Sequence, residues 1–299
     1  MRLLPFLVLA LPFVGCVRFG QLATGPGARL ASDAQFLTAG DLARPGPDAV
    51  VAEGLDLGRV SVVVYRPRTF RGRAPAVVFL PGLMAPEWQY ESYARDLASR
   101  GMVVAVRGGY GPFRSDAELA RDASLLADWL VASGLGDPKR MGVAGHSRGG
   151  KDAVWAGAVD PRFRAVVALD PDDQGPVSVV HGALRLLQTH LLLIGAELAW
   201  RGWQICCPRE HNYRRFFDAA PPGTIELELR GADHVQLMDS PDFPGMQVCR
   251  VGTADSRTVR TLARRALVSF FLEHLEGVRE RPLALGANGS LRVKRPRRS

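Results

Sequence analysis

Short apolar runs alternate along this chain with longer stretches that are apolar on one side only. Each short run is bounded by Gly, Pro or a polar cluster, which predicts a buried strand. The longer stretches have helical spacing, and the clearest of them has Asp116 and Glu118 in its first turn and Gly134 beyond its end. Strands are expected at residues 59–65, 76–80, 102–106, 141–144, 165–169, 191–194 and 225–229, and helices at residues 87–100, 116–131, 151–158 and 258–275.

Strands that alternate with helices predict an α/β fold, with a mostly parallel central sheet flanked by helices on both faces. The chain has 299 residues, of which 47% are hydrophobic, and this is enough for one large core. We therefore predict a single folded domain at residues 51–285, with residues 17–50 as a tether that leads into it.

The net charge of +8 is concentrated at the C-terminal end. Five cations and no acid lie among the last eight residues, which leaves +3 for the rest of the chain. A short basic end is typical of a solvated segment, so residues 286–299 are predicted to be a disordered basic tail. No basic patch is interleaved with aromatic residues, so nucleic-acid binding is not expected.

Residues 1–16 have the pattern of an export signal. Arg2 precedes an apolar run from Leu3 to Val14, which is too short to span a membrane but suits a secretory signal. The small residue before Cys16 resembles a bacterial lipoprotein processing site, which would leave Cys16 as a lipidated first residue. A leucine is more usual where Phe13 stands, so ordinary secretion stays open. We expect an exported protein, periplasmic or on the outer surface, held at a membrane through its N-terminal lipid.

The most specific motif of the chain is Gly145-His146-Ser147-Arg148-Gly149. It lies between an apolar run and a helix-forming run, which is the context that a G-x-S-x-G nucleophile elbow requires. The sharp turn forces the serine into a strained backbone conformation, and the two flanking glycines leave room for it. The pattern therefore predicts Ser147 as a catalytic nucleophile.

A nucleophilic serine needs a histidine as base and a carboxylate that orients the histidine. In this kind of fold the chain order is serine, acid, histidine, with each group after a strand. His234 follows the last predicted strand and fits the base, and Asp170 follows the run at 165–169 and fits the acid. The alternatives that stay open are His211 for the base and Glu197, Asp172 and Asp173 for the acid.

Two backbone N–H groups should stabilise the oxyanion of the tetrahedral intermediate. One belongs to Arg148, the residue after the nucleophile, and the other should come from the loop after the run at 76–80. Leu83 is the candidate in that loop, with Met84 as the alternative. The residues expected to wall an apolar substrate site are Leu83, Met84, Trp88, Trp200 and Trp203.

Three cysteines remain if Cys16 carries lipid, namely Cys206, Cys207 and Cys249. In an oxidising compartment we expect one disulfide between Cys249 and one member of the adjacent pair, and the sequence does not decide which member. The cysteine spacing matches no zinc pattern, and the histidines are not clustered with it. We therefore expect no metal, and a serine nucleophile needs no organic cofactor.

Several segments resemble the chlorophyllase branch of the α/β-hydrolases. The resembling segments are the elbow at 145–151, the aspartate–proline strand end at 168–173, the Cys- and Pro-containing segment at 206–212 and the histidine segment at 233–239. Cys249 also lies where that family often carries a cysteine. Over residues 59–275, the resemblance implies an α/β-hydrolase fold and a triad of Ser147, Asp170 and His234.

The chain departs from that family pattern at two places. Pro81 stands where the family usually has a histidine before the glycine of the oxyanion loop, and Arg107-Gly108-Gly109-Tyr110 also differs. The resemblance implies a serine ester hydrolase that acts through an acyl-enzyme on an apolar ester, whether chlorophyllase-like, lipid-like or polyester-like. Two alternatives stay open, a catalytically silent ligand-binding lipoprotein with this fold and an acyltransferase or thioesterase that uses the same triad.

Overall fold

The computed structural model describes residues 44–201, 206–242, 244–278 and 285–296, all of which belong to one compact unit. The strands are β1 (Val50–Asp56), β2 (Ser61–Pro67), β3 (Ala74–Leu80), β4 (Val103–Arg107), β5 (Gly136–His146), β6 (Phe163–Leu169), β7 (His190–Ala196), β8 (Ile225–Leu229) and β9 (Gly289–Val293). The α-helices are α1 (Glu91–Ala98), α2 (Asp116–Ala132), α3 (Arg148–Val159), α4 (Tyr213–Ala219) and α5 (Ser256–Phe271). Shorter helical turns are η2 (Glu87–Tyr90), η3 (Ala183–Leu186), η4 (Ala199–Arg201), η5 (His234–Leu237), η6 (Gln247–Cys249), the π-helical η7 (Leu272–Glu276) and η8 (Gly286–Asn288).

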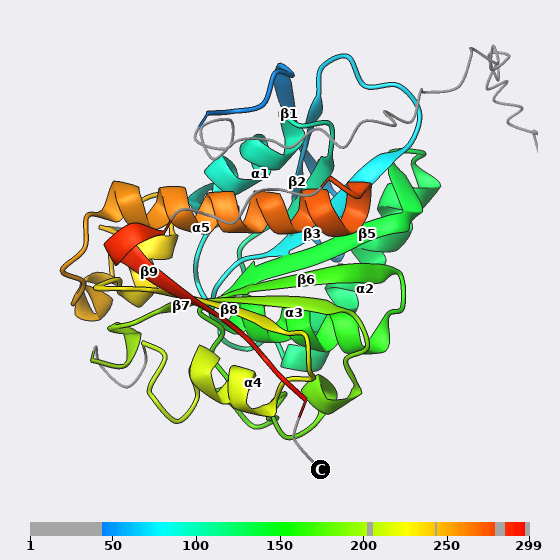
Figure 1. Cartoon of the computed structure of the whole chain (residues 1–299). Helices are drawn as coiled ribbons and strands as arrows, with labels where there is room; N and C mark the ends of the chain where they lie inside the picture. The colour runs from blue at the N-terminus through cyan, green and yellow to red at the C-terminus, as the bar shows by residue number, and fades with distance from the viewer. Residues whose placement is uncertain (1–43, 202–205, 243, 279–284, 297–299) are drawn as a thin grey trace, which may run out of the picture. The chain divides into compact units, whose positions relative to one another are not determined.

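In this part of the chain, all the strands form one sheet in the order β1-β2-β4-β3-β5-β6-β7-β8-β9 (Figure 1). Neighbours from β4 to β8 run parallel, whereas β1, β2 and β9 pair in antiparallel fashion at the two edges. The parallel strands place their carboxyl ends at one edge of the sheet, where the loops of such folds carry their functional groups. The predicted α/β-hydrolase fold is confirmed.

Both faces of the sheet are covered, and each carries its own apolar cluster. Successive side chains of a strand point to opposite faces. In β3, Val77 and Phe79 pack toward α1 and α5, whereas Val78 and Leu80 pack toward α2 and α3. Figure 1 shows α5 across one face, with α2 and α3 on the other. This double coverage explains why the inner strands are continuous apolar runs rather than alternating ones.

Each strand and helix that the sequence predicts is present, with shifts of a few residues at the ends. The pattern does not predict α4, a helix of seven residues capped by the Asn212 side chain, which accepts a hydrogen bond from the Arg214 N–H at 3.1 Å. The helix expected to run to residue 275 is α-helical to Phe271 and then continues as the π-helical turn η7.

The prediction of a disordered tail at residues 286–299 is wrong for β9. This strand pairs with β8 along its whole length, and the Arg292 guanidinium binds the buried carboxylate of Glu226, with Nε 2.8 Å from Oε1. Arg292 and Lys294 also lie over the ring of Phe217. One cation of this basic segment therefore neutralises a buried acid on the neighbouring strand.

The predicted export segment and Cys16 lie outside the described residues. Within the described ranges, no helix combines the length and apolar character needed to cross a membrane.

Candidate active site

Ser147 stands alone between the end of β5 and the start of α3, with φ 57° and ψ −126°. The turn is tight enough that neither flanking glycine can be replaced without a clash. A Cβ at Gly145 would lie 2.1 Å from the carbonyl oxygen of Gly149, and a Cβ at Gly149 would lie 2.2 Å from the carbonyl oxygen of Pro81. The strand–turn–helix elbow that the G-x-S-x-G motif predicts is present.

Positive φ angles at non-glycine residues gather at this site. In the described ranges such residues are Met84 (57°), Ser147 (57°), Asp170 (39°) and Cys207 (65°). Each such residue costs about 1–3 kcal/mol and persists only where the surrounding structure holds it. The Ser147 N–H, for example, donates to the Leu169 carbonyl at 2.9 Å. Strain of this kind clusters at functional sites, and here it falls on the elbow, the predicted acid and the predicted oxyanion loop.

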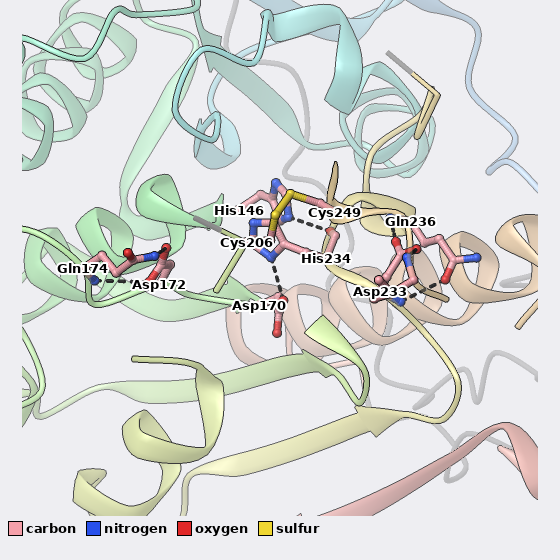
Figure 2. Close-up of a disulfide and its surroundings, with 10 residues drawn as sticks. His146, Asp170, Asp172, Gln174, Cys206, Asp233, His234, Gln236 and Cys249 are labelled. Carbon is pink, nitrogen blue, oxygen red and sulfur yellow. Dashed lines mark hydrogen bonds and ion pairs between the residues drawn. A yellow bond between two sulfur atoms is a disulfide. The ribbon is translucent and has the colours of Figure 1, made fainter. Parts of the chain in front are cut away.

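Asp170 and His234 form a buried hydrogen-bonded pair. Asp170 directly follows β6, and its Oδ2 accepts a hydrogen bond from Nδ1 of His234 at 2.6 Å (Figure 2). Its other oxygen accepts from the Ala196 N–H at 3.1 Å, so the carboxylate is held on both sides. His234 opens the turn η5, which Asp233 caps by accepting a hydrogen bond from the Gln236 N–H at 2.9 Å.

The alternative residues are engaged elsewhere. Glu197, Asp172 and Asp173 accept hydrogen bonds from backbone N–H groups rather than from His234. The backbone carbonyl of His211 accepts from the Asp173 N–H. Among the four candidate acids, Asp170 is therefore the one that accepts a hydrogen bond from the His234 ring.

The environment of His234 makes it a stronger base. Burial disfavours the charged imidazolium, but the hydrogen bond and the negative charge of Asp170 outweigh it, so the pKa of His234 is raised above its ordinary value. Ser147 and His234 line one cavity. Within the described part of the chain the Ser147 hydroxyl makes no hydrogen bond, as is common for a catalytic serine without substrate.

The loop after β3 lies directly against the elbow. A Cβ at Gly82 would be 3.3 Å from Cβ of Ser147. The Met84 N–H donates to the Tyr110 carbonyl at 3.2 Å and is therefore occupied, which leaves Leu83 as the candidate donor of this loop. Arg148 is the first residue of α3, where backbone N–H groups have no partner within the helix.

A network of buried charges supports the other side of the elbow. Asp116, at the start of α2, accepts from Nε of Arg148 at 2.6 Å and from Nζ of Lys151 at 2.8 Å. Lys151 is fully buried and also donates to the Gln174 carbonyl at 3.0 Å. Asp116 thus links α2 to the elbow helix, and Lys151 links that helix to the loop after Asp170.

The expected disulfide is present between Cys206 and Cys249 (Figure 2), which settles the choice that the sequence leaves open. Cys207 is a free, buried thiol that donates to the Pro171 carbonyl at 3.4 Å. The Cys207 Sγ, a carboxylate oxygen of Asp170 and a ring nitrogen of His234 lie within 4.8 Å of one another, a spacing that could hold a metal ion. Burial raises the pKa of the Cys207 thiol, so it stays protonated, and the aspartate and histidine already bind each other. This chemistry fits an orienting pair beside a thiol better than a metal site.

The cavity has a volume of about 560 Å³. Leu83 and Met84 line it as predicted, whereas Trp88 lines a neighbouring cavity beside Arg260. Trp200 is not among the described residues that line the cavity. Trp203 lies outside the part of the chain that the structure describes. Further apolar side chains of the cavity wall are Val235, Met238 and Met246. A polar side is formed by Asp116, Arg148, Asp172 and Gln174.

Sequence reasoning missed His146 and Tyr90. His146 is buried, and the centroid of its ring lies 4.5 Å from that of the His234 ring. Tyr90 binds His146 from η2. The only available signal was the position of His146 inside the elbow motif, since no pattern links it to Tyr90.

Comparisons with known proteins agree with this fold. The chlorophyllase family model matches residues 58–290. The chain is 22% identical over 254 residues to chlorophyllase type 0 of Chenopodium album, an alignment that covers 74% of this chain and 73% of that protein. It is 30% identical over 111 residues to the thiohydrolase apmlB of Arthrinium phaeospermum, which covers 34% of this chain and 36% of that protein. The match to the family model spans most of the described domain, and the chain belongs to the chlorophyllase family of α/β-hydrolases.

Proposed function

We propose that this chain is a serine ester hydrolase in which Ser147, Asp170 and His234 form the catalytic triad. The observation that carries the proposal is the 2.6 Å hydrogen bond between Asp170 and His234 at a cavity that also contains Ser147 on its strained turn. Membership of a hydrolase family supports the same chemistry.

The reaction begins with attack of Ser147 Oγ on the ester carbonyl carbon. Asp170 holds Nδ1 of His234, so Nε2 takes the proton of the serine hydroxyl. The Asp170 carboxylate stabilises the imidazolium that forms. The backbone N–H groups of Leu83 and Arg148 stabilise the oxyanion of the tetrahedral intermediate.

Collapse of this intermediate breaks the ester C–O bond. The alcohol leaves with the proton from His234, and the acyl group stays on Ser147. His234 then takes a proton from water, which attacks the acyl-enzyme. The second collapse releases the carboxylic acid and returns the proton to Ser147.

The cavity supports an apolar ester as substrate. Met84, Met238 and Met246 line it, and methionine side chains adapt to irregular apolar groups. Lipid-like, polyester-like and chlorophyllase-like esters all present such groups.

The test is turnover of p-nitrophenyl esters of increasing acyl length by the full-length chain, beside Ser147→Ala and the matched control Ser133→Ala. Ser133 is the C-cap of α2, at the other end of the helix from Asp116 of the cavity wall. Ser147→Ala should lower the rate by at least about 10³-fold, and Ser133→Ala should not change it. If the unmodified chain is inactive and no fluorophosphonate attaches to Ser147, the chain is a ligand-binding protein with a hydrolase fold.

A second candidate function is thioester hydrolysis or acyl transfer by the same triad. The resemblance to a protein named as a thiohydrolase favours it. Matched acyl esters and acyl thioesters of one chain length distinguish the two by their kcat/KM. An acyltransferase would instead convert added alcohols to new esters faster than it releases acid.

We also propose that the chain is exported and lipidated at Cys16. The N-terminal pattern supports this, and so does the Cys206–Cys249 disulfide, since disulfides persist in oxidising compartments. Mass spectrometry of the mature protein should find a diacylglyceryl group on Cys16 as the first residue. A mature chain that begins at another residue would contradict it.

A further inference from the structure

Four uncharged segments contribute to the cavity wall at the carboxyl edge of the sheet. The segments are residues 81–86, 108–113, 174–180 and 244–249. The second contributes one residue to the cavity wall, Pro112, and each of the others contributes at least three. None of them contains Asp, Glu, Lys or Arg, in a chain of which 23% is charged. These four segments therefore form an uncharged part of the cavity surroundings, beside the charged wall residues Asp116, Arg148 and Asp172.

These segments expose large apolar side chains. The apolar rim, as we call this set, consists of Leu83 (37% exposed), Met84 (63%), Phe113 (98%), Val177 (44%) and Val248 (39%). Leu83 and Met84 are themselves part of the cavity wall, and the other three are sequence neighbours of wall residues. An exposed apolar patch that adjoins a binding site marks an interaction surface.

The character of the apolar rim selects its partner. A protein interface contains about one hydrogen bond per 100–200 Å² of buried area, and none of the five side chains of the apolar rim carries a hydrogen-bonding N–H or O–H group. An anionic lipid surface would be met by clustered lysine and arginine, and the four segments contain neither. A neutral lipid surface requires only apolar side chains that can enter it, from several separate loops at once.

We propose that the apolar rim docks on a neutral lipid surface and places the cavity mouth directly over an ester dissolved in that surface. The rim is continuous with the cavity wall through Leu83 and Met84, so an apolar ester passes from lipid to cavity without crossing water. The expected effect on ester hydrolysis rests on the proposed function, whereas the docking on lipid does not depend on catalysis.

The docking is tested first without turnover. In the full-length chain with Cys16→Ser, which cannot carry lipid at that residue, Phe113→Trp is compared with the matched control Val159→Trp. Val159 is also exposed (58%), but it ends α3, a helix of twelve residues that starts at the elbow, so it lies about 18 Å away along the helix axis. Brominated phosphatidylcholine vesicles should quench Phe113→Trp more than Val159→Trp.

Equal quenching of the two variants would overturn the proposal, as would quenching that needs anionic phosphatidylglycerol in the vesicles. A dimer in solution that Phe113→Asp disrupts would also overturn it, since the rim would then serve a protein partner. Each of these outcomes can be read even if the chain hydrolyses no ester.

The consequence for catalysis is tested with Phe113→Asp and Val159→Asp. Phe113 does not line the cavity, so both variants should hydrolyse a water-soluble short ester at the unmodified rate. On a long-chain ester carried in phosphatidylcholine vesicles, Phe113→Asp should be about tenfold slower and Val159→Asp unchanged. A vesicle rate that Phe113→Asp leaves unchanged would overturn the proposal. Failure of the short ester in every variant would instead contradict the proposed function.

Discussion

The hydroxyl of Tyr90 lies 2.9 Å from Nδ1 of His146, and this buried hydrogen bond is the middle of a relay from the Gly82 N–H to the His234 carbonyl. The Gly82 N–H donates to the same hydroxyl at 3.0 Å, so the tyrosine proton is free to go to His146. Nε2 of His146 therefore carries the ring proton and donates to the His234 carbonyl at 3.1 Å. Burial holds the pKa of His146 well below its usual range, so the relay keeps one protonation state at neutral pH.

Removal of the Tyr90 hydroxyl should loosen both ends of this relay at once. Tyr90→Phe leaves the Gly82 N–H and Nδ1 of His146 without partners, which costs about 1–3 kcal/mol of unfolding free energy. We expect kcat for a soluble ester to fall about tenfold with KM little changed, because the oxyanion donor of the Gly82 loop is misplaced rather than removed.

The matched control is Tyr213→Phe, which removes another tyrosine hydroxyl, one that binds Glu228 at 2.5 Å. Urea unfolding should show a loss of stability for both variants, and kinetics should show a loss of kcat for Tyr90→Phe alone. Equal losses of kcat in the two variants would mean that Tyr90 acts only on stability.

The pH dependence of turnover should report the proposed base. His234 must be neutral to accept the serine proton, so kcat/KM should rise with pH through the pKa of His234. Burial lowers this pKa, but the hydrogen bond and the charge of Asp170 raise it by more, so the midpoint should lie above the ordinary value of 6.5.

Asp170→Asn removes the charge and leaves the burial. The midpoint of the residual activity should therefore move to lower pH, while the rate falls by about three to four orders of magnitude. The measurement is kcat/KM of a soluble ester from pH 5 to 9 for both proteins, with circular dichroism to check the fold. An identical midpoint in Asp170→Asn would show that the titrating group is not His234.

Local motifs made much of this site predictable, whereas contacts between distant residues did not. The elbow around Ser147 follows from the spacing of two glycines, and Asp170 follows from its place directly after an apolar run. Lys151 and Asp116 lie 35 positions apart, and nothing in the spacing of either one points to the other. The sequence did not predict β9 because its one cation, Arg292, lies in a cation-rich segment typical of solvated ends, and only the structure shows its partner Glu226.

The buried lysine offers a direct test of the charge network. Lys151→Met leaves Asp116 with Arg148 as its remaining partner, and loss of one partner of a buried ion pair costs about 3–5 kcal/mol. In Lys151→Met with Asp116→Asn, the uncompensated charge is gone, so the double variant should lose less stability than the two single losses added together. Urea unfolding of the two single variants and the double variant measures this coupling. Strict additivity would mean that the two side chains do not interact in solution.

The disulfide should stabilise the fold and the cavity wall together. Cys206 and Cys249 are 43 positions apart, and closing a loop of that length stabilises a fold by about 4 kcal/mol in the chain-entropy account. The bridge also fixes η6, next to Met246 of the cavity wall. Cys249→Ser should therefore lower the unfolding free energy by about that amount and weaken turnover of bulky esters more than of small ones.

The matched control is Cys207→Ser, which keeps the bridge and still offers a hydroxyl donor to the Pro171 carbonyl. It should lose about 1 kcal/mol or less. Dithiothreitol should bring the unmodified chain to the stability of Cys249→Ser and leave Cys249→Ser itself unchanged. If dithiothreitol still destabilised Cys249→Ser, a second pairing between the adjacent cysteines would have formed in its place. In that variant the stabilising disulfide would join Cys206 to Cys207 instead of joining Cys206 to η6.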